Sequence, residues 1–410
     1  MNADLVENRR NKKGFYFLTR IGPAWIVMIA DVDVASIITG LQSGATFGYR
    51  MIFIMLILIP PLFIVQNASG RLGIASGMGI GSAVRKRWDK NIAMMASIPM
   101  AATDFLSYIA EYSGIAIGFY LIGVPPILSV PAAFAVHNMV VIKGKYRRLE
   151  KLLMFVSVAV ILSIIISAIL MKPDITDIVK FGLSPLQPYS NRQFDLLMVA
   201  NIGAVVMPFM LFYQAGASVE KHLKENDLKI SRNETFIGAI VSEVLMVMIV
   251  IAGTAIGAYA TDPRQLQNAL YPFGSIAPVI EAIGFITAGF LALIVISLAS
   301  TWGVAEALGW NYKMGYPIRG QKNFYILYFL ESFPAAIIAI AFGYDLLNLI
   351  IDLMIVFVIV LAPVGVLLGL LIKDKNIMGE KRFGNGYMAI YWIMLAVIEI
   401  SGVYSLVISL

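Results

Sequence analysis

The chain has 410 residues and no cysteine, and it is 59% hydrophobic but only 14% charged. Soluble domains average about 45–50% apolar and about 25% charged residues. This composition therefore excludes an ordinary soluble enzyme, a disordered chain and a disulfide-stapled secreted module. The long unbroken apolar runs also differ from the short alternating segments of a membrane β-barrel. A polytopic helical membrane protein remains, in which the net charge of +6 reflects topology rather than nucleic-acid binding.

Eleven apolar segments are long enough to cross a bilayer core of about 30 Å, which needs roughly 20 helical residues. They are 21–43, 48–70, 92–121, 123–142, 148–171, 194–217, 234–260, 277–306, 323–342, 345–372 and 386–409. We therefore predict an all-α protein with about 11 transmembrane helices. Residues 1–20 form a basic tail. We expect no cleaved signal peptide, because the first segment contains two aspartates and no clear cleavage site follows it.

The positions of Lys and Arg predict a cytoplasmic N-terminus and an external C-terminus. With this orientation, all but five of the 31 basic residues fall on the cytoplasmic side, as the positive-inside rule requires. The five exceptions are Arg50, Lys172, Lys180, Arg192 and Arg264. A different number of helices would place basic residues on both sides of the membrane. The pattern therefore supports eleven spans, and we predict a multi-pass protein of the cell membrane.

Acidic residues inside the predicted spans are costly, and each needs a reason. They are Asp31, Asp33, Asp104, Glu111, Glu243, Glu306, Glu331, Asp352 and Glu399. No Lys or Arg lies in the middle of a span to pair with them, which favours a path for cations. The alternative is that several of them are protonated and hydrogen-bonded, or lie near an interface. For most of these residues the two interpretations stay open.

Asp31 and Asp33 lie two residues apart in the middle of the first span. On an intact helix, positions i and i+2 point away from each other. If both carboxylates face one cation, the helix must break here. Irregular backbone at membrane depth is tolerated only where it lines a cavity or is buried in protein.

Pro208 predicts a second interruption, in the sixth span, because proline has no N–H and clashes with the preceding turn. A plain proline kink is the alternative. The two interruptions are five spans apart, as expected for inverted repeats with a substrate site at the midplane. The predicted organisation is a first repeat over 21–171, an external loop over 172–193, a second repeat over 194–372, and a loop with the last helix over 373–410.

Several motifs resemble the NRAMP family of divalent metal transporters. They are Gly22-Pro23, Gly44-Ala45-Thr46-Phe47-Gly48-Tyr49, Arg71-Leu72-Gly73-Ile74-Ala75-Ser76-Gly77, Ala110-Glu111 with Gly114, Ala204-x-x-Met207-Pro208 and Ala299-Ser300-Thr301. The resemblance implies a LeuT-like fold of 5+5 inverted repeats, with helices 1 and 6 broken at the midplane. It also implies a metal site. The residues implied for that site are Asp33, Ser36, Ala204 and Met207, with Asp31 as an added carboxylate. Glu111 and Asp104 are titratable residues of the third span, and they are the candidates for a proton or cation path.

The sequence departs from the family pattern at informative positions. Asp-Pro-Gly-Asn becomes Asp33-Val34-Ala35-Ser36, and Met-Pro-His-Asn becomes Met207-Pro208-Phe209-Met210, so the histidine linked to proton movement is lost. The arginines expected in the ninth span are absent, and the glutamine near the metal in the tenth span aligns with Ile355. These changes resemble a divergent branch of the family that includes prokaryotic magnesium transporters.

We therefore expect a secondary transporter of Mg²⁺ or Mn²⁺ that works by alternating access and is weakly coupled to protons or uncoupled. Two aspartates and a small serine suit hydrated Mg²⁺, whereas the thioether of Met207 suits Mn²⁺ or Fe²⁺. A proton-coupled Mn²⁺/Fe²⁺ symporter is the alternative, and a non-transporting receptor or scaffold is another. The sequence has no Walker loop and only two histidines, His137 and His222, so we expect no enzyme.

The expected partners follow from this function. They are the divalent metal substrate and the lipid bilayer, without a cofactor, nucleic acid or obligatory protein partner. An amino-acid transporter of the same fold is disfavoured, because Asp33 would repel the carboxylate of such a substrate.

Overall fold

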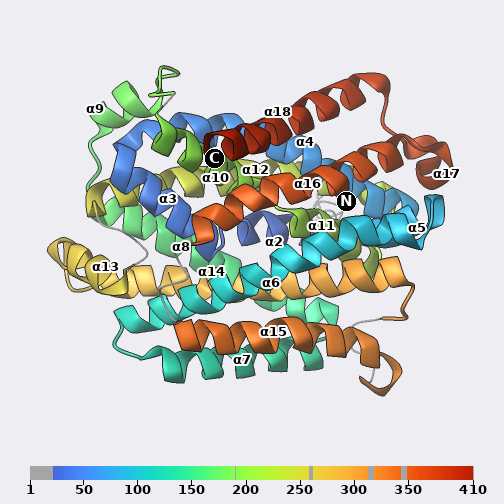
Figure 1. The fold of residues 1–410 in the computed structure, drawn as a ribbon, viewed down its shortest axis with the longest axis horizontal. Coiled ribbons are helices and arrows are strands. Elements are labelled where there is room, and N and C mark those ends of the chain that lie inside the picture. Colours follow the sequence, from blue (N-terminus) through green and yellow to red (C-terminus); the bar gives the residue numbers. More distant parts are fainter. Residues whose placement is uncertain (1–21, 190, 258–261, 313–317, 343–348, 410) are drawn as a thin grey trace, which may run out of the picture.

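The computed structural model in Figure 1 describes residues 22–189, 191–257, 262–312, 318–342 and 349–409. These residues contain helices and no strands, as predicted. The predicted basic tail, residues 1–20, lies outside the described residues. The α-helices are α2 (Pro23–Ala30), α3 (Val34–Phe47), α4 (Ile52–Ser76), α5 (Ile80–Arg87), α6 (Lys90–Leu121), α7 (Pro126–Lys143), α8 (Tyr146–Leu170), α9 (Ile175–Asp177), α10 (Arg192–Val205), α11 (Pro208–Glu220), α12 (Leu228–Ile256), α13 (Pro263–Leu270), α14 (Ala277–Leu308), α15 (Lys322–Phe342), α16 (Leu349–Lys373), α17 (Lys375–Met378) and α18 (Asn385–Ser409).

Each of the eleven predicted segments contains a helix. Ten helical stretches of the described chain are long and apolar enough to cross a membrane, with α3 and α4 counted as one stretch and α10 and α11 as another. The difference from eleven lies in the first segment, which is divided into α2, with 8 residues, and α3, with 14 residues. α3 then continues through a 3₁₀ turn, Gly48–Met51, into α4. The predicted count of spanning segments is therefore consistent with the structure.

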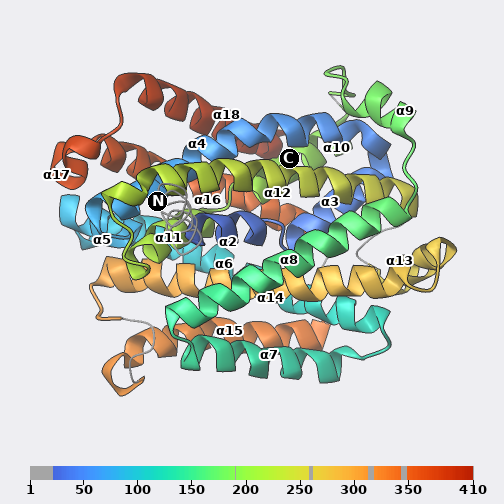
Figure 2. The same cartoon turned by 180° about the vertical axis from the view of Figure 1, so that it is seen from behind.

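The helices form layers that run roughly parallel in Figures 1 and 2. α7 and α15 lie at one edge and pack against α6, which packs along α14. α4 and α18 lie at the opposite edge. Between these layers, α12 packs against α2, α3 and α4, while α10 packs against α16 and α3. Both interrupted helices thus lie inside the bundle.

Burial follows the same arrangement. In the interrupted stretch from α10 to α11, 89% of the 18 most apolar consecutive residues are buried. In α7 and in α18 the buried share of the corresponding residues is 28%. The outer helices expose apolar side chains such as Phe155 and Ile400, which suits contact with lipid. The polar backbone of the two interruptions is therefore surrounded by protein, where irregular backbone is tolerated.

Candidate functional site

The first interruption lies where the paired aspartates predicted it. α2 ends at Ala30, and Asp33 is the N-cap of α3 in an extended conformation. Its Oδ1 accepts a hydrogen bond from the backbone N–H of Ser36 at 2.7 Å. An aspartate is a favoured N-cap because it satisfies a free N–H group and lies at the positive end of the helix dipole. Asp33 therefore begins α3 and at the same time brings a carboxylate to the break.

The second carboxylate oxygen of Asp33 remains available. Asp33 is only 1% exposed, and its Oδ2 has no hydrogen-bond partner among the described residues. A buried carboxylate oxygen without a donor is costly unless something else compensates its charge. This atom is the strongest candidate ligand for a cation in the first interruption.

The second interruption lies between α10 and α11. Val206 leaves the helical conformation, Met207 is extended with φ −91° and ψ 143°, and Pro208 begins α11. Pro is well suited to the first helical position because the N–H it lacks would be unbonded there. The same missing N–H leaves the carbonyl of Ala204, four residues earlier, without its usual helical donor. The sequence therefore frees a backbone oxygen at this break.

Ser36 joins the two interruptions. Its hydroxyl donates a hydrogen bond to the carbonyl oxygen of Asp31 at 2.7 Å and lies 3.4 Å from the carbonyl oxygen of Ala204. The structure thus brings together Asp31, Ser36 and Ala204. Met207 follows Ala204 by three residues and is fully buried. These residues and Asp33 were all predicted as ligands from the sequence, and they lie around the two breaks.

Glu111 lies beside the same break. Its Oε2 accepts a hydrogen bond from the backbone N–H of Val34 at 3.2 Å. The close approach of α6 and α3 depends on Gly114, because a Cβ atom at this position would lie 2.1 Å from Cγ1 of Val34. Glu111 therefore adjoins Asp33 through the first turn of α3.

Asp104 lies elsewhere, although it was predicted to share a path with Glu111. It precedes Glu111 on α6 by two helical turns, or about 10 Å. Its charge interacts with Glu331 of α15, whose Oε1 accepts a hydrogen bond from Ser300 at 2.8 Å. Both carboxylate oxygens of Asp104 lack a hydrogen-bond partner among the described residues. Asp104 therefore lies outside the two interruptions, about 10 Å from Glu111 along α6, and the path through both residues stays a prediction.

Other buried acids have structural partners. Glu306 accepts hydrogen bonds from the backbone N–H of Ser82 at 3.2 Å and from the hydroxyl of Tyr312 at 2.6 Å, and so holds the start of α5. Asp352 is exposed on α16. For these two acids the structure favours the hydrogen-bonded or interfacial interpretation.

Two features were not predicted from the sequence. The hydroxyl of Ser242, on α12, donates to Oδ2 of Asp31 at 2.7 Å. His137 is fully buried and forms 2.8 Å hydrogen bonds with the hydroxyls of Tyr112 and Ser297. The Ser242–Asp31 and His137–Ser297 bonds join segments far apart in the sequence, whereas Tyr112 and His137 lie on consecutive helices. The only signal in the sequence was the polar residue type inside an apolar span.

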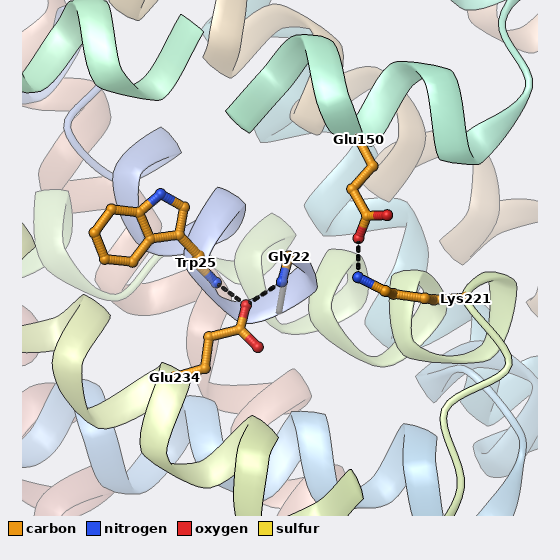
Figure 3. Close-up of polar contacts among 5 residues, drawn as sticks. All are labelled: Gly22, Trp25, Glu150, Lys221 and Glu234. Atoms are coloured by element: carbon orange, nitrogen blue, oxygen red, sulfur yellow. Dashed lines mark hydrogen bonds and ion pairs between the residues drawn. The ribbon is translucent and has the colours of Figure 1, made fainter. Parts of the chain in front are cut away.

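The predicted cytoplasmic end of α2 is held by the side chain of Glu234 (Figure 3). Oε1 of Glu234, on α12, accepts hydrogen bonds from the backbone N–H groups of Gly22 at 2.6 Å and Trp25 at 2.8 Å. Beside it, Lys221 and Glu150 form an ion pair between the end of α11 and α8. The first half-helix is therefore fastened at its start while its end carries the site.

The site is closed to solvent in this structure. Asp31, Asp33, Ser36, Ala204 and Met207 are each at most 1% exposed. Their oxygen atoms and the thioether are donors that a divalent cation accepts. A cation reaches these residues only if helices around the two breaks move.

Comparison with known proteins identifies the family. A family model described as natural resistance-associated macrophage protein-like matches residues 24–408. A divalent metal cation transporter MntH from Yersinia pestis (strain Pestoides F) is 30% identical over 223 residues, which cover 52% of this chain and 52% of that protein. The matched region is thus about half the length of that relative. An MntH of Bacillus subtilis (strain 168) is 23% identical over 402 residues, covering 94% of this chain and 91% of that protein.

Solved structures support the fold. A manganese transporter from Eremococcus coleocola has a TM-score of 0.76 at 18% identity, covering 95% of this chain and 86% of that one. MhsT in complex with L-phenylalanine has a TM-score of 0.63 at 15% identity, covering 94% of this chain and 98% of that one. At these identities the likeness concerns the fold alone, and it confirms the predicted LeuT-like architecture. Because the family model covers nearly all of the described chain, this protein belongs to the natural resistance-associated macrophage protein-like family.

Proposed function

We propose that this multi-pass membrane protein moves divalent metal cations across the cell membrane by alternating access. One observation carries the proposal: two helix interruptions meet at the hydroxyl of Ser36, which contacts the backbone of both. Such paired interruptions form the substrate sites of transporters with inverted repeats. The names of the relatives, divalent metal cation transporters and a manganese transporter, support the same class of substrate.

The proposed ligands are Asp33, Ser36, the carbonyl of Ala204 and Met207, with Asp31 as an additional carboxylate. Asp33 has the central role, since its Oδ2 is buried without a donor. The site excludes anionic substrates, because its side chains present carboxylates and no cation. Glu111 adjoins the site and adds a further carboxylate to those of Asp31 and Asp33.

Mg²⁺ is the preferred substrate in this proposal, with Mn²⁺ the close alternative. Carboxylates and a hydroxyl suit Mg²⁺, which keeps several of its waters when bound. Met207 favours the alternative, because a thioether suits Mn²⁺ and Fe²⁺ better than Mg²⁺. We propose weak or absent proton coupling, with uptake driven by the membrane potential at about 2.3 kcal/mol per charge per 100 mV.

Uptake into liposomes that contain the purified protein tests this function. Mg²⁺ and Mn²⁺ are supplied side by side under a fixed potential, with internal metal and internal pH recorded together. Saturable entry of Mg²⁺ that Mn²⁺ shares or inhibits is expected, with no change of internal pH. Entry of Mn²⁺ alone with internal acidification supports the proton-coupled alternative, and no entry of either ion contradicts transport.

Two variants assign the site in the same assay. Asp33→Ala should abolish uptake in protein that remains monodisperse in detergent, and uptake at the wild-type rate would contradict the site. Met207→Ala should reduce Mn²⁺ uptake far more than Mg²⁺ uptake if the thioether is a ligand. Equal losses for both ions would leave Met207 a packing residue.

A further inference from the structure

Glu243 has no role in the site described above, yet it lies next to it. It belongs to α12, which continues unbroken past the first interruption and packs against both α2 and α3. The side chain is fully buried. Both of its carboxylate oxygens lack a hydrogen-bond partner among the described residues. A buried glutamate in this condition needs a compensating charge or a proton.

Asp31 is the acidic residue next to this part of α12, because it bonds to Ser242. Glu243 directly follows Ser242 on α12, and its carboxylate repels that of Asp31 electrostatically. Oδ2 of Asp31 accepts the hydrogen bond from Ser242, and Oδ1 has no partner. Three carboxylate oxygens without donors and one hydroxyl therefore gather between the end of α2 and the middle of α12.

No basic side chain neutralises this group within the described part of the chain, where no ion pair includes Asp31 or Glu243. Burying an uncompensated carboxylate costs several kcal/mol. The end of α2 adds to the negative potential, because helix C-termini carry partial negative charge. All the donors are oxygen atoms, which are the ligands of hard cations such as Mg²⁺ and Mn²⁺.

We propose that Asp31, Glu243 and the hydroxyl of Ser242 form a second binding position for a hard divalent cation, beside the position at Asp33. This inference rests on the proposed function, since it places a second ion of the same class in the same site. Two divalent ions balance the four buried carboxylates of the region. These are Asp31, Asp33, Glu111 and Glu243.

The second position differs in chemistry from the first. It has no thioether, so it discriminates less against Mg²⁺ than the position near Met207. It also joins a half-helix to an unbroken helix, so movement of the end of α2 away from α12 takes the ligands apart. An ion is therefore held here only while these two helices are together.

Counting bound Mn²⁺ tests the proposal. The purified full-length protein is titrated with Mn²⁺ to millimolar concentrations, and free Mn²⁺ is followed by its electron paramagnetic resonance signal. Wild type should bind two ions, Glu243→Gln one, Asp33→Asn one, and the double variant none. A matched control is Glu281→Gln, which changes a buried glutamate bonded to Ser167 of α8 and should leave two ions bound. A single ion in wild type, or equal numbers in wild type and Glu243→Gln, would overturn the second position.

Ser242→Ala provides a milder variant that keeps both carboxylates, should Glu243→Gln fail to elute as a monodisperse species. It should weaken the second Mn²⁺ at least about fivefold and leave the first unchanged, whereas two unchanged affinities would overturn the proposal. Added Mg²⁺ should displace the second Mn²⁺ at lower concentration than the first. Liposome uptake separates the two proposals: wild type that transports but binds one ion contradicts the second position alone, and wild type that transports nothing contradicts the function.

Discussion

Glu111 and Val34 are joined by a hydrogen bond in which the backbone N–H of Val34 donates to Oε2 of Glu111 at 3.2 Å. Asp33 accepts the N–H of Ser36 in the same turn. Two carboxylates, one from α6 and one from the N-cap of α3, thus accept hydrogen bonds from backbone N–H groups in the first turn of α3. The helix dipole favours negative charge at this end. Glu111 therefore stabilises the break in addition to any role in moving ions.

Replacement of Glu111 separates its hydrogen bond from its charge. Glu111→Ala leaves the buried N–H of Val34 unpaired and should lower the free energy of unfolding by about 1–3 kcal/mol. Glu111→Gln retains an oxygen acceptor and should lose less than half of that. Denaturation of the detergent-solubilised protein measures both variants. Equal losses would show that the charge, rather than the hydrogen bond, holds the helix terminus.

Ser36→Ala removes the hydroxyl that contacts both interruptions. We expect the KM for Mg²⁺ uptake to rise about 5- to 10-fold, since one hydrogen bond contributes about 0.5–1.5 kcal/mol. Ser401→Ala is a matched control, because among the described residues its hydroxyl bonds to Ile398 of the same outer helix, α18. Liposome uptake at graded Mg²⁺ concentrations measures the change. A KM equal to that of the control would contradict a role for Ser36 in the site.

Glu234→Ala should loosen the start of α2, because two backbone N–H groups lose their acceptor at once. The absence of cysteine from the chain allows a single reporter, Ala24→Cys, at a position that is 1% exposed. Its labelling by a maleimide should become at least about fivefold faster, as a loss of about 1 kcal/mol implies. Glu380→Ala, in an exposed ion pair with Lys375, is the control and should not change the rate. An unchanged rate in Glu234→Ala would show that other contacts hold α2.

The ion pair between Arg87 and Asp374 predicts a pH dependence outside the membrane. Burial raises the pKa of Asp374, but hydrogen bonds from Arg87 and the N–H of Asn376 outweigh it, so the pKa lies below its ordinary value of 3.8. A lowered pKa means that the stabilisation is present above the ordinary value and is lost as the pH falls through the folded value. The difference in stability between wild type and Asp374→Asn should therefore be constant from pH 5 to 8 and should shrink below about pH 4. Because the pair is partly exposed, its size should not exceed about 1 kcal/mol. Thermal unfolding of both proteins across this range measures it, and a change between pH 6 and 8 would implicate another group.

Both interruptions could be predicted because they depend on local chemistry. Pro208 cannot donate a hydrogen bond, and two aspartates at i and i+2 cannot face one ion on an intact helix. Helix ends were less predictable. α12 begins at Leu228 rather than at residue 234, because hydropathy detects the apolar core of a span and not the polar turns before it.

The partners of Asp31 could not be predicted. Ser242 is 211 residues away along the chain, and nothing local to either residue indicates the contact. Glu243 was recognisable as a costly acid in an apolar span, but the packing of α12 against α2 determines what it faces. The same reason applies to Asp104, because the packing of α6 against α15 determines its surroundings.

A single oxygen of Glu234 accepts both hydrogen bonds at the start of α2. A movement of the start of α2 away from α12 breaks both of them, and the carboxylate then loses both donors together. The carboxylate is then buried without these two hydrogen bonds, which is costly. The first half-helix should therefore be released from α12 in one step rather than one hydrogen bond at a time.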